Sequence, residues 1–200
     1  MEEKIQSSDI DIRINKLTEE DIEKLSSFSC GNDKLDDFFH NEIYICSKYH
    51  YVSAYCVKDV QSDEIVAVFT LANDAVVIGD VNDDLEDFIQ MSALRINEEY
   101  LPVFKQQTSF PAINIGHLGT RADLQSKGIG TKVLDFVLTT FINYDIAGCQ
   151  FITVDSLNNE KTNKFYMKNG FSNQTNNDMT HDTRRMYLPI ELYRHEEDKD

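Results

Sequence analysis

The chain has 200 residues, 41% hydrophobic and 10% aromatic, which is enough for one substantial core and one domain. Its formal net charge is −16 at pH 7, and no apolar run approaches the ~20 residues of a membrane helix, so we expect no membrane span. The N-terminus lacks a basic region followed by an apolar run, which indicates an unexported, cytoplasmic protein.

The first elements are a strand and a capped helix. Residues 10–14, "IDIRI", alternate apolar and polar side chains as a half-buried strand does. Thr18 followed three residues later by Asp21 is typical of a capping box, which predicts that a helix begins there.

A second helix and a hairpin follow. After a cap at Asn32 or Asp33, five apolar residues recur at helical spacing: Leu35, Phe38, Phe39, Ile43 and Cys46. The β-branched and aromatic runs 51–59 and 64–72, separated by a short polar turn, predict a β-hairpin.

Residues 80–107 have a weaker pattern. Four apolar residues suggest a short amphipathic helix: Leu85, Phe88, Ile89 and Met91. The polar run that continues to Pro111 indicates an exposed excursion.

The C-terminal half alternates strands and helices. Strand 112–120 changes its alternation at Gly116–His117, which predicts a bulge there. A helix is then expected with six apolar residues on one side: Val133, Leu134, Val137, Leu138, Phe141 and Ile142. Strand 149–154, helix 160–168 and strand 184–190 complete an α/β layer with some parallel pairing, in a single domain 1–200 that ends in a short acidic tail, 195–200.

The turn "QSKGIG" lies between the bulged strand and the apolar-striped helix. A helix N-terminus in that place presents unpaired backbone N–H groups and a favourable dipole to an anion. Gly128 and Gly130 allow close approach of the backbone, and Lys127 adds a positive charge. The pattern is neither a Walker A motif nor a dinucleotide fingerprint. By itself it is also compatible with a purely structural turn.

A second motif lies about thirty residues downstream, in "NEKTNKFYMKNGF". Together, Q-x-x-G-x-G and N-x6-Y-x3-G-F resemble the GNAT acetyltransferase superfamily over roughly residues 112–171. The segment "FSCGNDKLDDFF", 28–39, is similar to a bacterial subgroup that includes tRNA-acetylating toxins. The resemblance implies a central mixed β-sheet flanked by helices, and transfer of an acetyl group from acetyl-CoA to an amine.

The resemblance also implies roles for individual residues. The pyrophosphate cradle would be formed by Gln125, Ser126, Lys127, Gly128, Ile129, Gly130 and Thr131. Leu118, Gly119 and Thr120 would pair through their backbones with the pantetheine arm, and Asn159 would hydrogen-bond it. Tyr166 would be the general acid, because a phenol of pKa ~10 is protonated at neutral pH and can donate to a thiolate of pKa ~8.5.

His117 is the first candidate for a general base, since imidazole titrates near neutrality. The alternative is a structural histidine. His117 stands where the toxin-like relatives usually carry Arg, which speaks against a nucleic-acid substrate.

Charge further favours a cationic amine, on a small molecule or a peptide, as acceptor. Residues 1–100 hold 8 Lys/Arg against 23 Asp/Glu, a balance of −15, whereas residues 101–200 hold 11 against 12. Nucleic-acid binding draws on Lys/Arg contacts with phosphates, so we expect no binding of bulk tRNA. Two alternatives remain, a toxin that acetylates aminoacyl-tRNA and a non-catalytic acetyl-CoA-binding regulatory module. The oligomeric state stays open, a homodimer included.

No metal is expected. The four cysteines show no C-x-x-C pairing, and the five histidines form no H-x-x-x-H set. Free thiols in a reducing compartment are the simplest interpretation.

Overall fold

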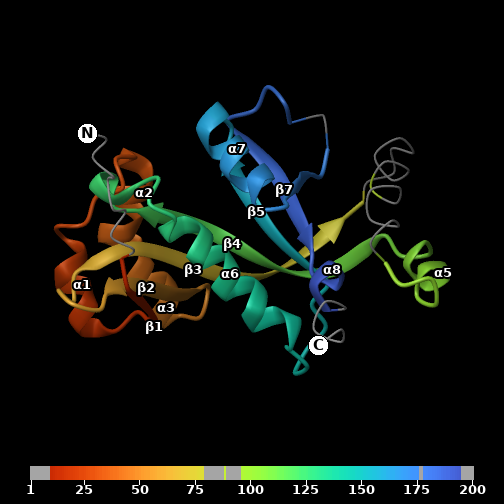
Figure 1. Ribbon diagram of the computed structural model, residues 1–200, viewed down its shortest axis with the longest axis horizontal. Coiled ribbons are helices and arrows are strands. Elements are labelled where there is room, and N and C mark those ends of the chain that lie inside the picture. The colour runs from red at the N-terminus through yellow and green to blue at the C-terminus, as the bar shows by residue number, and fades with distance from the viewer. Residues whose placement is uncertain (1–9, 79–87, 89–95, 176–177, 195–200) are drawn as a thin grey trace, which may run out of the picture. The chain divides into compact units, whose positions relative to one another are not determined.

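The computed structural model describes residues 10–78, 88, 96–175 and 178–194. Its strands form a mixed seven-stranded sheet in the order β1-β2-β3-β4-β5-β7-β6 (Figure 1). The contacts within the chain group it into two compact units. The first unit comprises residues 1–70 and 117–132, and the second comprises residues 71–116 and 133–200. That the chain is a single domain stays a prediction.

The first unit contains the predicted N-terminal strand and the start of the predicted hairpin. β1 (Ile12–Lys16) runs antiparallel to β2 (Ser53–Asp59). A polar turn, in which Asp63 adopts a left-handed φ of 61°, leads from β2 into β3 (Ile65–Val77). β3 continues five residues beyond the predicted run and extends into the second unit.

The predicted helix cap at Thr18 is confirmed. α1 (Glu19–Leu25) begins directly after Thr18. The Asp21 carboxylate accepts hydrogen bonds from the Thr18 backbone N–H at 3.0 Å and from the Thr18 hydroxyl at 2.8 Å. Asp21 also forms an ion pair with Lys58 and is only 2% exposed, so this cap is tied into the interior of the unit.

The second predicted helix is interrupted by a π-helical turn. α2 (Asp33–Asp37) is capped by Asn32, whose side chain accepts from the Leu35 N–H at 3.1 Å. The π-helical turn η1 (Phe38–Glu42) follows, and α3 (Ile43–Lys48) completes the segment. A wider turn accommodates one more residue than an α-helical turn does, and such turns are often found at functional sites.

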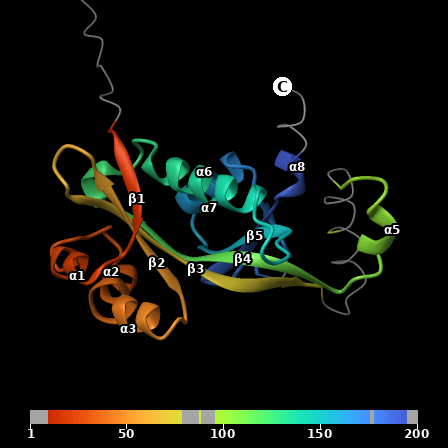
Figure 2. The ribbon, with the colours of Figure 1, turned by 90° about the horizontal axis from the view of Figure 1, so that it is seen from below.

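These helices cover one side of the strands in the first unit (Figure 2). Their core is a cluster of buried side chains: Leu25, Phe28, Cys30, Phe39, Ile43, Ala54, Cys56, Ile65 and Val68. Phe39 and Ile43, from the predicted helical stripe, are each 1% exposed. The stripe was therefore a correct guide to burial even though the helix is not continuous.

The second unit contains the expected parallel strand pair. β4 (Ser109–Thr120) and β5 (Phe151–Leu157) pair in parallel from Ala112 opposite Phe151 to Ile115 opposite Val154. β7 (Thr183–Pro189) runs antiparallel to β5 along its whole length, and β6 (Ser172–Asn173) pairs with β7. The bulge at Gly116–His117 stays a prediction.

Two predicted helices are present. α6 (Ile129–Ile142) begins in the first unit and buries four residues of its predicted stripe in the second: Val133, Leu134, Val137 and Phe141. α7 (Glu160–Lys168) has the predicted bounds and packs against β5 (Figure 1). Two short helices were not expected, α5 (Leu101–Phe104) and α8 (Glu191–Arg194). No described helix is both long and apolar enough to cross a membrane.

The predicted exposed excursion before Pro111 is confirmed for most of the described residues 96–110, but two aromatic side chains in it are buried. Phe104 of α5 and Phe110 of β4 are each 1% exposed and belong to the core of the second unit, with Phe88, Phe151 and Tyr187. Polar neighbours hid these aromatic side chains from a pattern based on average polarity. In the predicted helix, Phe88 is helical and 2% exposed, whereas Leu85, Ile89 and Met91 lie outside the described residues, as does the acidic tail 195–200.

Candidate active site

The glycine turn leads directly into the N-terminus of α6. Ser126 and Gly128 both have left-handed backbones, with φ of 63° and 81°. The first hydrogen bond of the helix runs from the Lys132 N–H to the Gly128 carbonyl, at 3.0 Å. The N–H groups of residues 129–131 therefore precede the first intrahelical bond, as expected for an anion-binding helix start.

Open space lies over Gly128. A Cβ added to this residue would meet no heavy atom of the described residues within 4 Å. The side chains of the neighbouring residues Ser126 and Lys127 are exposed. The side chain of Ile129 is only 2% exposed and fixes the turn to the interior of the protein. The turn thus combines backbone donors that have no partner in the described part of the chain, a nearby cation and room for a bulky anion, which fits a pyrophosphate group.

Gln125 fastens the turn to the N-terminal segment. Its side-chain amide donates to the Cys30 carbonyl at 2.8 Å and to the Thr120 carbonyl at 3.3 Å. The Ala122 N–H also donates to the Ser29 carbonyl, at 2.9 Å. These hydrogen bonds of the Gln125 side chain hold the turn 125–131 in its conformation. The segment 28–39 supports the turn through the carbonyl groups of Ser29 and Cys30.

His117 lies between an aromatic ring and a hydroxyl group. Its ring stacks on Phe38, with centroids 3.6 Å apart and planes 7° apart, and meets Phe39 edge-on at 6.4 Å. Its Nδ1 atom is 3.1 Å from the hydroxyl of Thr70, which is fully buried. Burial lowers the pKa of His117 below its ordinary value, so the ring is neutral at pH 7.

The end of β4 contacts the π-helical turn closely. Gly119 is buried, and a Cβ added there would come within 2.6 Å of the Phe39 ring. A glycine is required at this position by that close approach. Leu118 and Thr120, on either side, are half-buried.

Tyr166 is a buried phenol on α7, in the second unit. It is 7% exposed, and its ring meets Phe165 at 5.0 Å and Phe171 at 5.3 Å in edge-to-face contacts. Burial raises its pKa above the ordinary value for tyrosine, so the phenol is protonated throughout the physiological pH range.

Asn159 caps α7. Its side-chain oxygen accepts from the Thr162 N–H at 2.9 Å, and the residue is exposed. The cap occupies the oxygen and leaves the amide N–H₂ as the group that could donate to a ligand carbonyl.

Comparison with known proteins identifies the family of the chain. The model of the acetyltransferase (GNAT) family matches residues 21–171. The chain belongs to the GNAT family.

Solved structures with the same fold, at low sequence identity, include a toxin and complexes of it. AtaTR bound with AcCoA is 19% identical, with a TM-score of 0.68 over 92% of this chain and 98% of the other. AtaT complexed with acetyl-methionyl-tRNAfMet is 17% identical, with a TM-score of 0.68 over 92% and 97%. A Tyr-to-Phe mutant of KacT is 15% identical, with a TM-score of 0.69 over 90% and 95%. No curated protein matches the sequence.

The structure divides the predicted GNAT site residues between the two units. The strand end 117–120 and the cradle 125–131 belong to the first unit, and Asn159 and Tyr166 belong to the second. Sequence reasoning missed Thr70 and Phe38 as neighbours of His117, because both are far from it in the sequence.

A polar network on the second unit was also missed. Asp74 of β3 accepts hydrogen bonds from Thr153 and Arg185, and Arg185 pairs with Asp155 at 2.8 Å. The Asn114 amide donates to Thr153 at 3.2 Å. These residues come from four neighbouring strands, and Asn114 and Thr153 are nearly fully buried, so sequence periodicity alone would assign these two positions to the apolar core.

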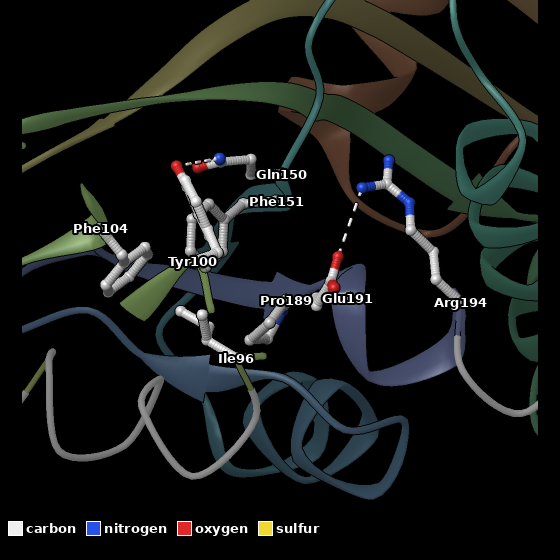
Figure 3. Close-up of a pocket in the computed structure, with 8 residues that line it drawn as sticks. All are labelled: Ile96, Tyr100, Phe104, Gln150, Phe151, Pro189, Glu191 and Arg194. Carbon is white, nitrogen blue, oxygen red and sulfur yellow. Dashed lines mark hydrogen bonds and ion pairs between the residues drawn. The ribbon is translucent and has the colours of Figure 1, made fainter. Parts of the chain in front are cut away.

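The second unit also contains a cavity of about 270 Å³ (Figure 3). Its lining is mostly aromatic and apolar: Ile96, Tyr100, Phe104, Gln150, Phe151, Pro189, Glu191 and Arg194. The Gln150 amide donates to the Tyr100 hydroxyl at 2.6 Å, and Glu191 pairs with Arg194 at 3.4 Å. None of the predicted GNAT site residues lines this cavity.

Proposed function

We propose that the protein is an acetyl-CoA-dependent N-acetyltransferase whose acceptor is an amine of low pKa, which costs little to deprotonate at pH 7. The observation that carries the proposal is the turn 125–131, where free helix N–H groups, open space over Gly128 and Lys127 come together in a chain of the GNAT family. Acetyl-CoA supplies the reactive thioester. Acetyl-CoA bound to the related structure AtaTR supports this assignment.

The residues of the first unit would bind and orient the acyl carrier. The N–H groups of residues 129–131 would hold the pyrophosphate, and Lys127 would add charge stabilisation. The backbone of residues 118–120 would hydrogen-bond the pantetheine arm, in the manner of an added strand. Asn159, in the second unit, would donate its side-chain N–H₂ to the same arm.

Tyr166 would donate a proton to the departing thiolate. Its buried phenol keeps its proton at neutral pH, which is the protonation state that an acid needs. No covalent intermediate on the protein is required, because the amine can attack the thioester directly.

Protonation of the acceptor narrows its chemical class. A lysine-like amine of pKa ~10.4 costs roughly 4.6 kcal/mol to deprotonate at pH 7, whereas an α-amine near 8 costs only about 1.4. Among the described residues no carboxylate contacts His117, so its ring lacks the partner that would make it a strong base. We therefore favour an α-amine, on a small molecule or a peptide, over a side-chain amine.

The decisive experiment is a screen for release of the CoA thiol. Purified protein and acetyl-CoA are incubated with α-amines, polyamines and lysine peptides, and free thiol is followed against a Tyr166→Phe control. Turnover with an α-amine, lost in the variant, supports the proposal. Tight binding of acetyl-CoA without turnover on any acceptor would favour the regulatory module instead.

A second candidate acceptor is the α-amine of an aminoacyl-tRNA. AtaT complexed with acetyl-methionyl-tRNAfMet has the same fold over nearly the whole chain, and the related structures do not support our exclusion of nucleic acid. The excess of acidic residues is also divided more evenly between the two units of the structure than between the two halves of the sequence. The first unit holds 10 Lys/Arg against 16 Asp/Glu, a balance of −6, and the second holds 9 against 19, a balance of −10.

Charged tRNAs therefore belong in the same screen. A mixture of aminoacyl-tRNAs is incubated with labelled acetyl-CoA, and the label in nucleic acid is counted with Tyr166→Phe as control. Labelling lost in the variant would establish this second acceptor, and absence of label alongside turnover on free α-amines would exclude it.

A further inference from the structure

The hydrogen bonds of Thr70 determine which nitrogen of His117 carries the proton. The Thr70 hydroxyl accepts a hydrogen bond from the His117 backbone N–H at 3.1 Å, and it also lies 3.1 Å from Nδ1 of the same residue. A threonine hydroxyl has one proton to donate. Thr70 is fully buried, and among the described residues Nδ1 is the acceptor within reach of that proton.

The imidazole proton is consequently on Nε2. If Nδ1 carried it instead, two donors would point at the Thr70 oxygen and the buried hydroxyl proton would have no acceptor among the described residues. A buried unsatisfied donor disfavours that arrangement by on the order of 10- to 100-fold. The Nε2–H tautomer is therefore the stable neutral form.

The surroundings of the ring also keep it from taking up a second proton. Phe38 and Phe39 pack against it from η1, and Thr70 contacts it from β3. No charged side chain contacts the ring among the described residues. Burial lowers the pKa of His117, so the cation is disfavoured at pH 7.

We propose that His117 is a hydrogen-bond donor of the acetyl-transfer site, fixed by Thr70 as the Nε2–H tautomer, and that it binds a carbonyl oxygen and takes no proton from the amine. The proposal rests on the proposed function. Nδ1 is occupied by the Thr70 hydroxyl and Nε2 already carries a proton, so neither nitrogen is available as a base. Nε2 has no hydrogen-bond partner among the described residues.

Its position makes a carbonyl the fitting acceptor. His117 directly precedes residues 118–120, the stretch assigned to the pantetheine arm, and a neutral N–H suits a neutral oxygen. That oxygen belongs either to the acetyl thioester or to the amine substrate. Thr70 is then a positioning residue, which acts through the ring of His117.

The first test is nitrogen NMR of the histidine ring in the wild-type protein, which needs no acceptor. We expect Nε2 to be protonated and Nδ1 to be unprotonated from pH 7 to 8. Thr70→Val, which keeps the shape and removes the hydroxyl, should mix the two tautomers, and Thr70→Ser should keep the wild-type signals. A ring protonated at Nδ1, or one that titrates between pH 7 and 8, would overturn the proposal even if the valine variant does not fold.

The second test compares His117→Gln, which keeps an N–H donor near the position of Nε2, with His117→Phe, which keeps only the stacking ring. With the best acceptor from the amine screen, we expect the glutamine variant to stay within roughly 10-fold of wild type. The phenylalanine variant should lose roughly 10- to 100-fold, as expected for a removed donor. His117 would instead be a base if two results were found together. Both variants would lose the same amount of activity, and both would lack the fall in activity at low pH that the wild-type protein shows.

The same variants distinguish the source of the oxygen. If the thioester is held, His117→Phe should weaken binding of acetyl-CoA but not of CoA, as measured by calorimetry. If the amine substrate is held, both affinities should stay and the KM of the acceptor should rise. Failure of the wild-type protein to bind acetyl-CoA would overturn the proposed function, whereas the NMR result would still report on the tautomer.

Discussion

His117 in the first unit is half-buried and Tyr166 in the second is buried, and loss of contact with water shifts their pKa values in opposite directions with the same consequence. It lowers the pKa of the imidazole and raises that of the phenol, so both groups are neutral at pH 7. They differ in their partners. His117 is oriented by a hydroxyl group and a stacked ring, whereas the contacts of the Tyr166 ring are with aromatic neighbours.

The comparison shows that the protonation state of a side chain and its orientation have different causes. Burial alone is enough to set the charge of both groups, but only His117 has a hydrogen bond that selects one of two neutral forms. A tyrosine has a single neutral form and needs no such selection. The proposed role of Tyr166 as a proton donor is therefore compatible with its place among apolar rings, whereas a histidine with a defined role requires a polar neighbour.

The largest expected effect comes from removing the phenol of the second unit. Tyr166→Phe should lower kcat by about 10²- to 10⁴-fold, the usual contribution of a positioned acid, and leave acetyl-CoA affinity nearly unchanged. Because the ring and its packing stay, the melting temperature should change little. Full turnover of the variant, under conditions where chemistry limits the rate, would reduce Tyr166 to a core residue.

The next largest effect is expected from the glycine turn of the first unit, with His117 and Tyr166 left unchanged. Wild-type protein at acetyl-CoA a hundredfold above Kd should gain ~2.7 kcal/mol of stability, measured by thermal unfolding. Gly128→Glu should abolish this gain, because it adds a side chain and a negative charge to the open space over the turn. Gly128→Asn is the matched control, since asparagine tolerates the left-handed backbone and adds no charge.

A smaller effect tests whether hydrogen-bonding partners can reverse the pKa shift that burial alone would cause in a carboxylate. Asp21 is 2% exposed, yet hydrogen bonds from Lys58 and Thr18 outweigh burial, which by itself would raise the value, and lower its pKa to about 2. A folded pKa below the unfolded value of 3.8 means that stability is fully present above pH 4 and is lost as the pH falls toward 2. Acid unfolding of wild type should show a loss of about 2 kcal/mol in that window.

Asp21→Asn should remove most of this pH dependence and destabilise the protein at pH 7, because Lys58 loses its buried partner. Asp63→Asn is the control, since Asp63 pairs with Lys24 at the exposed surface and should matter much less. Equal pH dependence in Asp21→Asn and wild type would show that Asp21 is not the group responsible.

The smallest expected effect comes from long-range attraction between the acceptor and the net negative charge that both units carry. Both carry an acidic balance, so the KM of a cationic amine should rise by roughly a few-fold as salt screens the attraction over ~10 Å at 0.1 M. A neutral amine should show no such trend. A KM that falls with salt, for amines or for aminoacyl-tRNA, would indicate that the acceptor meets repulsion and carries negative charge.

Local motifs were predictable from the sequence, and contacts between distant segments were not. The Thr18 cap, the bounds of α7 and the turn at Gly128 each depend on residues within a few positions of one another. The contact between Thr70 and His117 joins residues 47 positions apart, and no periodicity encodes it. The buried Phe104 shows the same limit, because its polar neighbours hide a contact that only the folded chain makes.

The π-helical turn η1 also changes the phase of the helix that it interrupts. In an unbroken α-helix, Asp36 and Ile43 are seven residues apart and would face nearly the same direction, within ~20°. One added residue rotates the second part by roughly 100° relative to the first. Asp36 can therefore accept from Ser29 and the Cys30 N–H, at 2.6 and 2.8 Å, while Ile43 enters the core at 1% exposure. Deleting a single residue from 38–42 would leave Asp36 and Ile43 six positions apart, about 120° apart on a regular α-helix, so a variant without the wider turn could keep both the polar contact and the buried apolar one.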